Sequence, residues 1–279
     1  MDTNSNQARR VVIGITAHVD AGKTTLAEAM LYRTGRLRKL GRVDHGSAAM
    51  DSHLLERERG ITIFSSQAEL PIGDLEVTLL DTPGHVDFSA EMERTLSVLD
   101  YAILVISGAD GVQAHTRTLW RLLELYRIPT FLFVTKMDFG RCDRGQMMEH
   151  LRHELGEGCV DFTPADRERR MEQLATCRED ALEAYLDGGE VPDALVRQLV
   201  GRRLVFPCWF GSGLKLEGID EFLEGLARYV EPPVYPETFS ARVFKISHDP
   251  QGKRLTHLKV TGGTLRVRDA VSYAGHQEK

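Results

Sequence analysis

The chain has 279 residues, a formal net charge of −6 and 42% hydrophobic residues, which is ordinary for a folded protein and long enough for one large domain and part of another. No apolar run approaches the roughly 18 residues of a membrane span, and residues 1–10 lack the apolar segment of a secretory signal, so we expect a cytoplasmic protein without membrane contact. The acidic balance argues against a protein that binds nucleic acid with its whole surface. The four cysteines form no Cys-x-x-Cys pair and predict reduced thiols rather than a zinc site.

From residue 11 to residue 230, apolar runs typical of buried strands alternate with segments of helical periodicity. The predicted strands are 11–16, 62–69, 76–80, 101–106, 130–134 and 204–210. The predicted helices are 23–32, 87–99, 114–126, 143–154, 168–186, 193–203 and 219–229. This alternation predicts an α/β fold with a mostly parallel sheet and helices on both faces. Ligands of such sheets bind at the carboxyl ends of the strands.

The pattern also suggests how the chain divides into domains. Residues 1–10 are expected to be a disordered lead-in, and 11–230 to be one nucleotide-binding domain. The Pro-rich stretch 231–237 predicts a stiff linker. Residues 238–279 have the pattern of a β-barrel that begins here, with strands expected at 239–246, 255–260 and 264–267. About forty residues are too few to close a barrel of five or six strands, so we expect the chain to stop inside its second domain.

A long polar segment, 35–60, separates the first helix from the second strand. Loops of this length inside a domain are usually functional or mobile. Basic residues are concentrated around it, namely Arg33, Arg36, Arg38, Lys39, Arg42, Arg57 and Arg59. Contact with phosphate groups and simple solvation explain this basic stretch equally well.

A phosphate-binding loop follows the first predicted strand. Its sequence is Ala17-His18-Val19-Asp20-Ala21-Gly22-Lys23-Thr24-Thr25. A strand, a tight loop and Gly-Lys-Thr at a helix start are the context that a P-loop requires, although Ala17 replaces the glycine of the strict pattern. The backbone N–H groups from Asp20 to Thr24 favour an anion, and Gly22 lets the backbone approach it closely. We expect Lys23 to contact the β- and γ-phosphates and the Thr24 hydroxyl to ligate Mg²⁺.

The motif Asp81-Thr82-Pro83-Gly84 ends a later predicted strand. The Asp81 carboxylate is placed to hold Mg²⁺ through a water, and the Gly84 N–H to contact the γ-phosphate. Taken alone, the motif is also compatible with an ordinary turn. Its position after a strand favours the same site as the P-loop.

Two motifs at the ends of later strands select the base. The Asp138 carboxylate can accept two N–H donors from guanine, a pair that adenine lacks, and the stem of Lys136 would lie along the base and ribose. Ser212, Gly213 and Leu214 can present backbone N–H groups to the guanine carbonyl oxygen. Surface turns remain the alternative for both motifs.

With its motifs in this order, the sequence resembles the translational GTPases, densely over 11–138 and again from 212 to 271. Elongation factor G shares the motif Ala-His-x-Asp-Ala-Gly-Lys-Thr-Thr. The ribosomal protection proteins, which confer tetracycline resistance, are more similar at 40–46, 55–60, 97–100 and 111–117. Elongation factor G typically has Trp after the Met-Asp of the effector loop, where this chain has Ser52. We favour the ribosomal protection branch.

The resemblance implies a catalytic set of Lys23, Thr62 and His85. Thr24 and Thr62 would be the two direct protein ligands of Mg²⁺, with Asp81 as the third metal-site residue. Thr62 lies in the effector loop, which would become ordered only with GTP. His85 would position the attacking water or stabilise charge around it.

The resemblance also implies roles for the neighbours of this set. Val19 and Ile61 resemble an apolar pair that holds His85 away until the ribosome acts, and simple packing explains them equally well. Asp20 lies where the family also holds a monovalent cation. His18 is expected to be a packed neighbour rather than a catalytic group.

One residue departs from the family pattern. Thr135 stands where the family usually has Asn, which has two donors and an acceptor and ties the guanine to the P-loop. Threonine has one hydroxyl. We therefore expect weaker guanine binding that stays specific through Asp138.

The resemblance implies a protein that binds GTP and GDP with Mg²⁺ and hydrolyses GTP under stimulation by the ribosome. Contacts with ribosomal RNA and proteins would come from the full-length protein, whose action would release tetracycline. The alternatives are a translocation GTPase of the elongation factor G type and a GTP-binding module without significant hydrolysis. The present chain alone is expected to be monomeric and to hydrolyse GTP slowly.

Overall fold

The computed structural model describes residues 9–39, 66–82, 89–139, 143–163, 167–249, 251–273 and 276–278. The chain divides into two units, Met1–Pro232 and Pro233–Lys279. The strands of the first unit are β1 (Arg9–Ala17), β2 (Ser66–Ile72), β3 (Leu75–Asp81), β4 (Tyr101–Ser107), β5 (Thr130–Thr135), β6 (Cys159–Asp161) and β7 (Phe206–Phe210). Its helices are α1 (Lys23–Arg33), α3 (Ser89–Leu96), α4 (Ala114–Leu125), α5 (Arg144–Leu155), α6 (Arg167–Cys177), α7 (Glu179–Gly188), α8 (Asp193–Gly201) and α9 (Ile219–Tyr229), with a short 3₁₀ turn η3 (Met137–Phe139).

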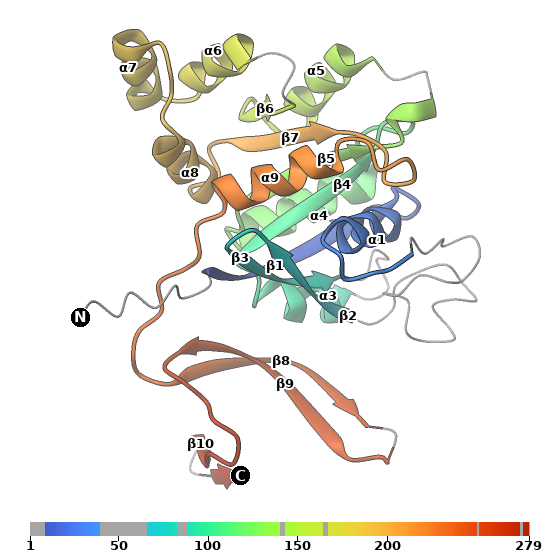
Figure 1. The fold of residues 1–279 in the computed structure, drawn as a ribbon, viewed down its shortest axis with the longest axis vertical. Helices are drawn as coiled ribbons and strands as arrows, with labels where there is room; N and C mark the ends of the chain where they lie inside the picture. The colour runs from blue at the N-terminus through green and yellow to red at the C-terminus, as the bar shows by residue number, and fades with distance from the viewer. Residues whose placement is uncertain are drawn as a thin grey trace. The chain divides into compact units, whose positions relative to one another are not determined.

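The first unit is built on a seven-stranded sheet in the order β2-β3-β1-β4-β5-β7-β6 (Figure 1). β2 and β3 pair antiparallel, and the other neighbouring strands pair parallel. The predicted mostly parallel sheet is therefore confirmed. Parallel pairing brings the carboxyl ends of β1, β3, β4, β5 and β7 to one edge of the sheet, where open α/β sheets bind their ligands.

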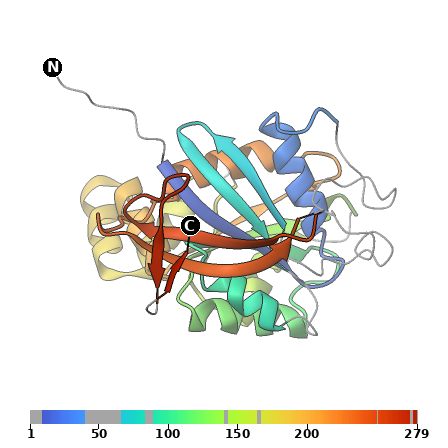
Figure 2. The same ribbon diagram turned by 90° about the horizontal axis from the view of Figure 1, so that it is seen from below.

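Both faces of the sheet are covered by helices, and the central strands alternate between the two cores. Ile103 and Val105 of β4 pack into the core that includes residues of α1, α6, α8 and α9. Ala102 and Leu104 pack into the core that includes residues of α3, α4 and α5. Figure 2 shows α1 and α9 on one side of the sheet and α3 and α4 on the other. Because both faces are buried, β4 is buried along its whole length.

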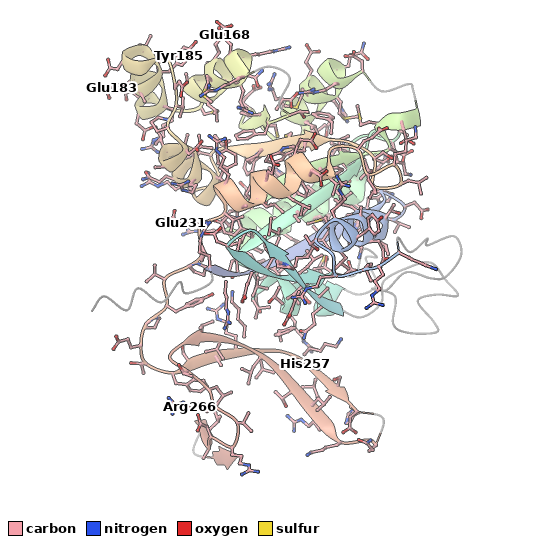
Figure 3. All side chains as sticks on the ribbon, viewed as in Figure 1. Glu168, Glu183, Tyr185, Glu231, His257 and Arg266 are labelled. Carbon is pink, nitrogen blue, oxygen red and sulfur yellow. The ribbon has the colours of Figure 1, made fainter. Side chains whose placement is uncertain are left out.

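The single helix predicted over 168–186 is wrong, because two helices, α6 and α7, occupy this region. Arg178 separates them with an extended backbone, φ −163° and ψ 153°. Leu174 of α6 and Ala181 of α7 pack into the same core, so the apolar pattern runs across the break and does not reveal it. Glu168 and Glu183 extend outward from the two helices (Figure 3).

In the part of the second unit that the structure describes, the strands form two antiparallel pairs. β8 (Ser240–His248) pairs with β9 (Arg254–Gly262), and β10 (Val271–Tyr273) pairs with β11 (His276–Glu278). The strand predicted over 264–267 is wrong, because Val267 lies in a turn with Arg268, whose φ is 72°. Within the described residues, no helix combines the length and the apolar character needed to cross a membrane.

Candidate nucleotide-binding site

Four predicted motifs meet at the carboxyl edge of the sheet because each follows a strand that ends there. Ala17 and Asp81 are the last residues of β1 and β3, and Ile15 pairs with Asp81 in the parallel register. Thr135 ends β5, where Val134 pairs with Phe210 of β7. Residues far apart in the sequence are thereby placed on neighbouring strands (Figure 1).

The P-loop forms the tight turn that its sequence predicts. The Ala21 N–H donates to the His18 carbonyl at 3.1 Å, and the Leu26 N–H donates to the Gly22 carbonyl at 2.9 Å, which begins α1. Gly22 has φ 90° and ψ 22°, a left-handed backbone that favours glycine, and no side chain caps the helix start. Backbone donors at an uncapped helix start, together with the helix dipole, favour a bound anion.

The P-loop lysine is paired with the carboxylate at the end of β3. Lys23 Nζ lies 2.5 Å from Asp81 Oδ1, with side chains 9% and 0% exposed, and it donates to the Thr82 carbonyl. Thr82 is itself fixed to β1, because its N–H and its hydroxyl both donate to the Ile15 carbonyl, at 3.1 and 2.9 Å. Contacts that involve β3 and β1 thus fix the position of the Lys23 ammonium group.

The donor chemistry next to this pair fits a magnesium ion. Thr24 is the second residue of α1 and half-buried, and Asp81 is fully buried at the strand end. A hydroxyl and a carboxylate are the hard oxygen donors that Mg²⁺ prefers. The third predicted metal residue, Thr62, lies outside the described residues.

Thr135 connects the end of β5 to the P-loop. Its hydroxyl donates to the Ala21 carbonyl at 2.5 Å, with the Ile106 carbonyl at 3.2 Å as a second acceptor. The ideal Cβ position of Gly22 lies 3.4 Å from Thr135 Oγ1, an ordinary contact. Threonine therefore makes the connection between the base-recognition strand and the P-loop in this chain.

The base-recognition motif places Asp138 in η3, with its side chain 11% exposed. Burial raises the pKa of Asp138. Its own backbone N–H, the Ser212 hydroxyl and the Lys215 ammonium together lower the pKa by more than burial raises it, so the pKa lies below the usual value of 3.8. Lys215 Nζ lies 3.4 Å from Asp138 Oδ2. The carboxylate therefore stays ionised near neutral pH and is available to accept N–H donors.

The loop after β7 offers fewer backbone donors than its sequence suggests. The Ser212 N–H donates to the Glu217 carbonyl and the Glu217 N–H to the Ser212 carbonyl, both at 3.0 Å. The predicted contact with the guanine carbonyl therefore rests on Gly213 and Leu214. The ideal Cβ of Gly213 would lie 3.1 Å from the Thr25 carbonyl oxygen, so this loop packs tightly against the start of α1.

Some of the remaining predicted site residues lie outside the part of the chain that the structure describes. Gly84, His85 and Ile61 lie outside the described residues, as does Thr62, so their roles stay predictions. His18 packs against His115, with ring centroids 5.9 Å apart, as expected of a packed neighbour.

Two charged residues at the site were not predicted. Lys215 pairs with Asp138, and Asp110 Oδ2 lies 3.9 Å from Lys136 Nζ. Lys215 directly follows Leu214, so a cation next to the base motif could have been noticed in the sequence. Asp110 carries no such signal, since it reaches Lys136 only because β4 and β5 are neighbours.

This arrangement of P-loop, carboxylate and base motif is that of a nucleotide-binding domain of the P-loop class. The family model for the elongation factor Tu GTP binding domain matches residues 8–232. The chain belongs to this family, which makes it a translational GTPase domain.

Within this family, the chain is similar to proteins named for resistance to tetracyclines. The chain is 39% identical to the oxytetracycline resistance protein of Streptomyces rimosus, 34% identical to the tetracycline resistance protein TetO of Campylobacter jejuni and 36% identical to TetM from transposon Tn916 of Enterococcus faecalis. Each match covers 93% of this chain and 43% of the relative, so the chain spans less than half the length of these proteins. The predicted relationship to tetracycline resistance proteins is confirmed.

A solved structure supports the fold over nearly the whole chain. A crystal structure of a protein from Thermus thermophilus has 28% sequence identity and a TM-score of 0.87. The similarity covers 98% of this chain and 48% of that chain. The predicted fold class is therefore confirmed by a known structure.

Proposed function

We propose that this chain is the GTP-hydrolysing part of a protein that acts on the ribosome in the cytoplasm and releases tetracycline from it. The observation that carries the proposal is the junction of two motifs, in which the Thr135 hydroxyl bonds the P-loop at Ala21 and the ionised Asp138 carboxylate lies beyond it. Phosphates at the P-loop and guanine at Asp138 would be held by one rigid frame. Relatives named for tetracycline resistance support the biological role.

The residues divide the reaction among them. The P-loop N–H groups and Lys23 would bind the β- and γ-phosphates and stabilise charge that develops on transfer. His85 would orient the attacking water. Thr24, Thr62 and Asp81 would hold Mg²⁺, which when bound neutralises phosphate charge.

The finer domain boundaries belong to the same proposal. We assign 11–230 to the GTP-binding domain, 231–237 to a linker and 238–279 to the beginning of a β-barrel. The ribosome would complete the catalytic site, so the isolated chain would be a monomer with slow hydrolysis.

Single-turnover GTP hydrolysis by the full-length protein, with and without intact ribosomes, tests the activity. We expect stimulation by ribosomes, and a His85→Ala variant that binds GTP normally but hydrolyses it about 10²-fold or more slowly. If ribosomes gave no stimulation, the chain would be a GTP-binding module instead.

The biological role is tested in cells. Tetracycline sensitivity is compared in cells with the intact gene, without it, and with the His85→Ala variant. Resistance only with the intact gene is expected. Unchanged drug sensitivity together with rescue of a translocation defect would indicate the elongation factor G role.

A further inference from the structure

A cavity of about 360 Å³ lies where α5, β6 and α6 meet, and none of its described lining residues belongs to a nucleotide motif. α5 and α6 both contact β6, as Figure 1 shows. The polar residues that line the cavity are Arg144, Arg152, Arg169, Arg170, Asp161 and Gln173. Four guanidinium groups thus surround one carboxylate among the described lining residues.

Two of these arginines are oriented by contacts that do not balance their charge. Arg152 Nε donates to the Cys159 carbonyl at 3.1 Å, and Arg170 Nη1 donates to the Phe162 carbonyl at 3.3 Å. Carbonyl oxygens accept a hydrogen bond but carry no formal charge. The Asp161 carboxylate is already engaged, because Arg144 Nε donates to its Oδ2 at 2.5 Å. Among the lining residues that the structure describes, Arg152 and Arg170 therefore leave an excess of positive charge.

Among the residues that the structure describes, two polar atoms at this cavity are buried without a hydrogen-bond partner, Arg170 Nε and Gln173 Oε1. The Arg170 Nε–H is a donor that an anion can accept, whereas Gln173 Oε1 is an acceptor that needs a donor such as water. Buried polar atoms are nearly always paired, and an unpaired one costs on the order of 1–3 kcal/mol. A water molecule could satisfy such atoms, but it would not compensate the guanidinium charges.

We propose that this cavity binds a phosphate-bearing anion. The planar guanidinium fork matches the oxygens of phosphate in charge-assisted, two-pronged hydrogen bonds. A phosphate dianion balances the excess charge better than a single carboxylate does, and the volume lies within the range of small-ligand sites. The phosphate would belong either to a free small molecule, as a dianion, or to an RNA backbone, in which each phosphodiester carries one negative charge.

Calorimetric titration of the 279-residue chain with inorganic phosphate tests the proposal. The P-loop is first saturated with GDP and Mg²⁺, and a Lys23→Ala variant identifies any signal that comes from the P-loop. We expect one saturable site that acetate fills at least tenfold more weakly. No saturable binding, or acetate binding as tight as phosphate binding, would overturn the proposal.

Two variants locate the site and one serves as their control. Gln173→Glu adds a carboxylate at nearly constant volume. It should weaken phosphate binding at least tenfold without lowering the thermal unfolding temperature. Arg170→Gln should weaken phosphate binding to a similar extent. Arg121→Gln on the exposed face of α4 removes the same charge elsewhere and should leave binding within twofold of the parent. Equal losses in Arg121→Gln and Gln173→Glu would contradict a site in this cavity.

A competition titration with a short RNA duplex then distinguishes the two sources of phosphate. Displacement of inorganic phosphate by the duplex in the parent, together with direct binding of the duplex that Gln173→Glu weakens at least tenfold, assigns the site to an RNA backbone. Phosphate binding that the duplex leaves unchanged assigns it to a free phosphorylated molecule.

Discussion

At the scale of single residues, the Thr135 hydroxyl holds two parts of the nucleotide site together. Replacing Thr135 by Val keeps the shape and removes the donor to the Ala21 carbonyl. We expect a loss of about 1 kcal/mol, roughly fivefold in the Kd for GDP. Fluorescence titration with a labelled GDP measures it, and Thr135→Ser, which retains the hydroxyl, should remain near the parent. Equal affinities of the Val and Ser variants would show that the hydroxyl has no part in binding.

Asp138 is expected to determine base choice. Asp138→Asn exchanges an acceptor for a donor, so the preference should move from GTP toward xanthosine triphosphate by roughly tenfold or more. Competition titrations with GTP, ATP and xanthosine triphosphate measure the change. Lys215→Gln retains the carboxylate and serves as the control, with guanine preference unchanged. An Asn variant whose preference did not move toward xanthosine triphosphate would remove Asp138 from this role.

The pH dependence of base recognition follows from the same carboxylate. Burial raises the pKa of Asp138, and the opposing hydrogen bonds and Lys215 bring it below 3.8. The ionised carboxylate is therefore lost only as the pH falls through this lowered pKa. Any stability that the ionised form contributes is lost over the same pH range. The ratio of Kd values for GDP and inosine diphosphate, which lacks the 2-amino group, should stay constant from about pH 8 to pH 5. A ratio of the Kd for GDP to the Kd for inosine diphosphate that rises toward 1 as the pH falls to 5 would mean that the carboxyl group titrates higher.

The sequence carried most of this residue-scale information, since a motif specifies both residue types and their spacing. It predicted Lys23, Asp81 and Asp138 as site residues, and the structure places all three at one sheet edge. It could not supply Asp110, because that contact depends on which strands are neighbours. Nor could it show that the Ser212 N–H is already bonded to Glu217.

At the scale of elements, α9 packs against β7 through Gly225. A Cβ at Gly225 would lie 2.2 Å from Cζ2 of Trp209, and the Trp209 ring is fixed between Phe162 and Phe222. Gly225→Ala should therefore destabilise the protein by about 1–3 kcal/mol, measured by denaturant unfolding. Gly188→Ala, at the end of α7 with nothing within 4 Å, should be neutral or stabilise by up to about 1 kcal/mol. A Gly225→Ala variant as stable as the parent would contradict this packing.

Elements with long periodic patterns were predictable, and short or interrupted ones were not. β4 and β5 are continuous apolar runs, which mark strands buried on both faces. β6 has three residues, too few for any periodicity to be visible. The break at Arg178 is a local backbone choice inside an uninterrupted apolar pattern.

At the scale of the whole molecule, the described nucleotide motifs all lie in the first unit, which ends at Pro232. A chain truncated after Pro232 keeps both cores of this unit. We expect it to bind GDP with a Kd within about twofold of the 279-residue chain, because a unit with its own core can fold alone. The same fluorescence titration tests this, with thermal unfolding as the control for folding. A much weaker Kd in a folded truncated chain would mean that residues 233–279 contribute to the site.

The ion pair between Lys23 and Asp81 affects the stability of the folded chain. A buried ammonium without a counter-ion is costly, and Asp81 supplies that counter-ion from within the chain. The charge of Lys23 is therefore compensated from within the chain itself. An Asp81→Asn chain would lack this internal counter-ion. Its thermal unfolding temperature would therefore depend on added GDP far more than that of the parent.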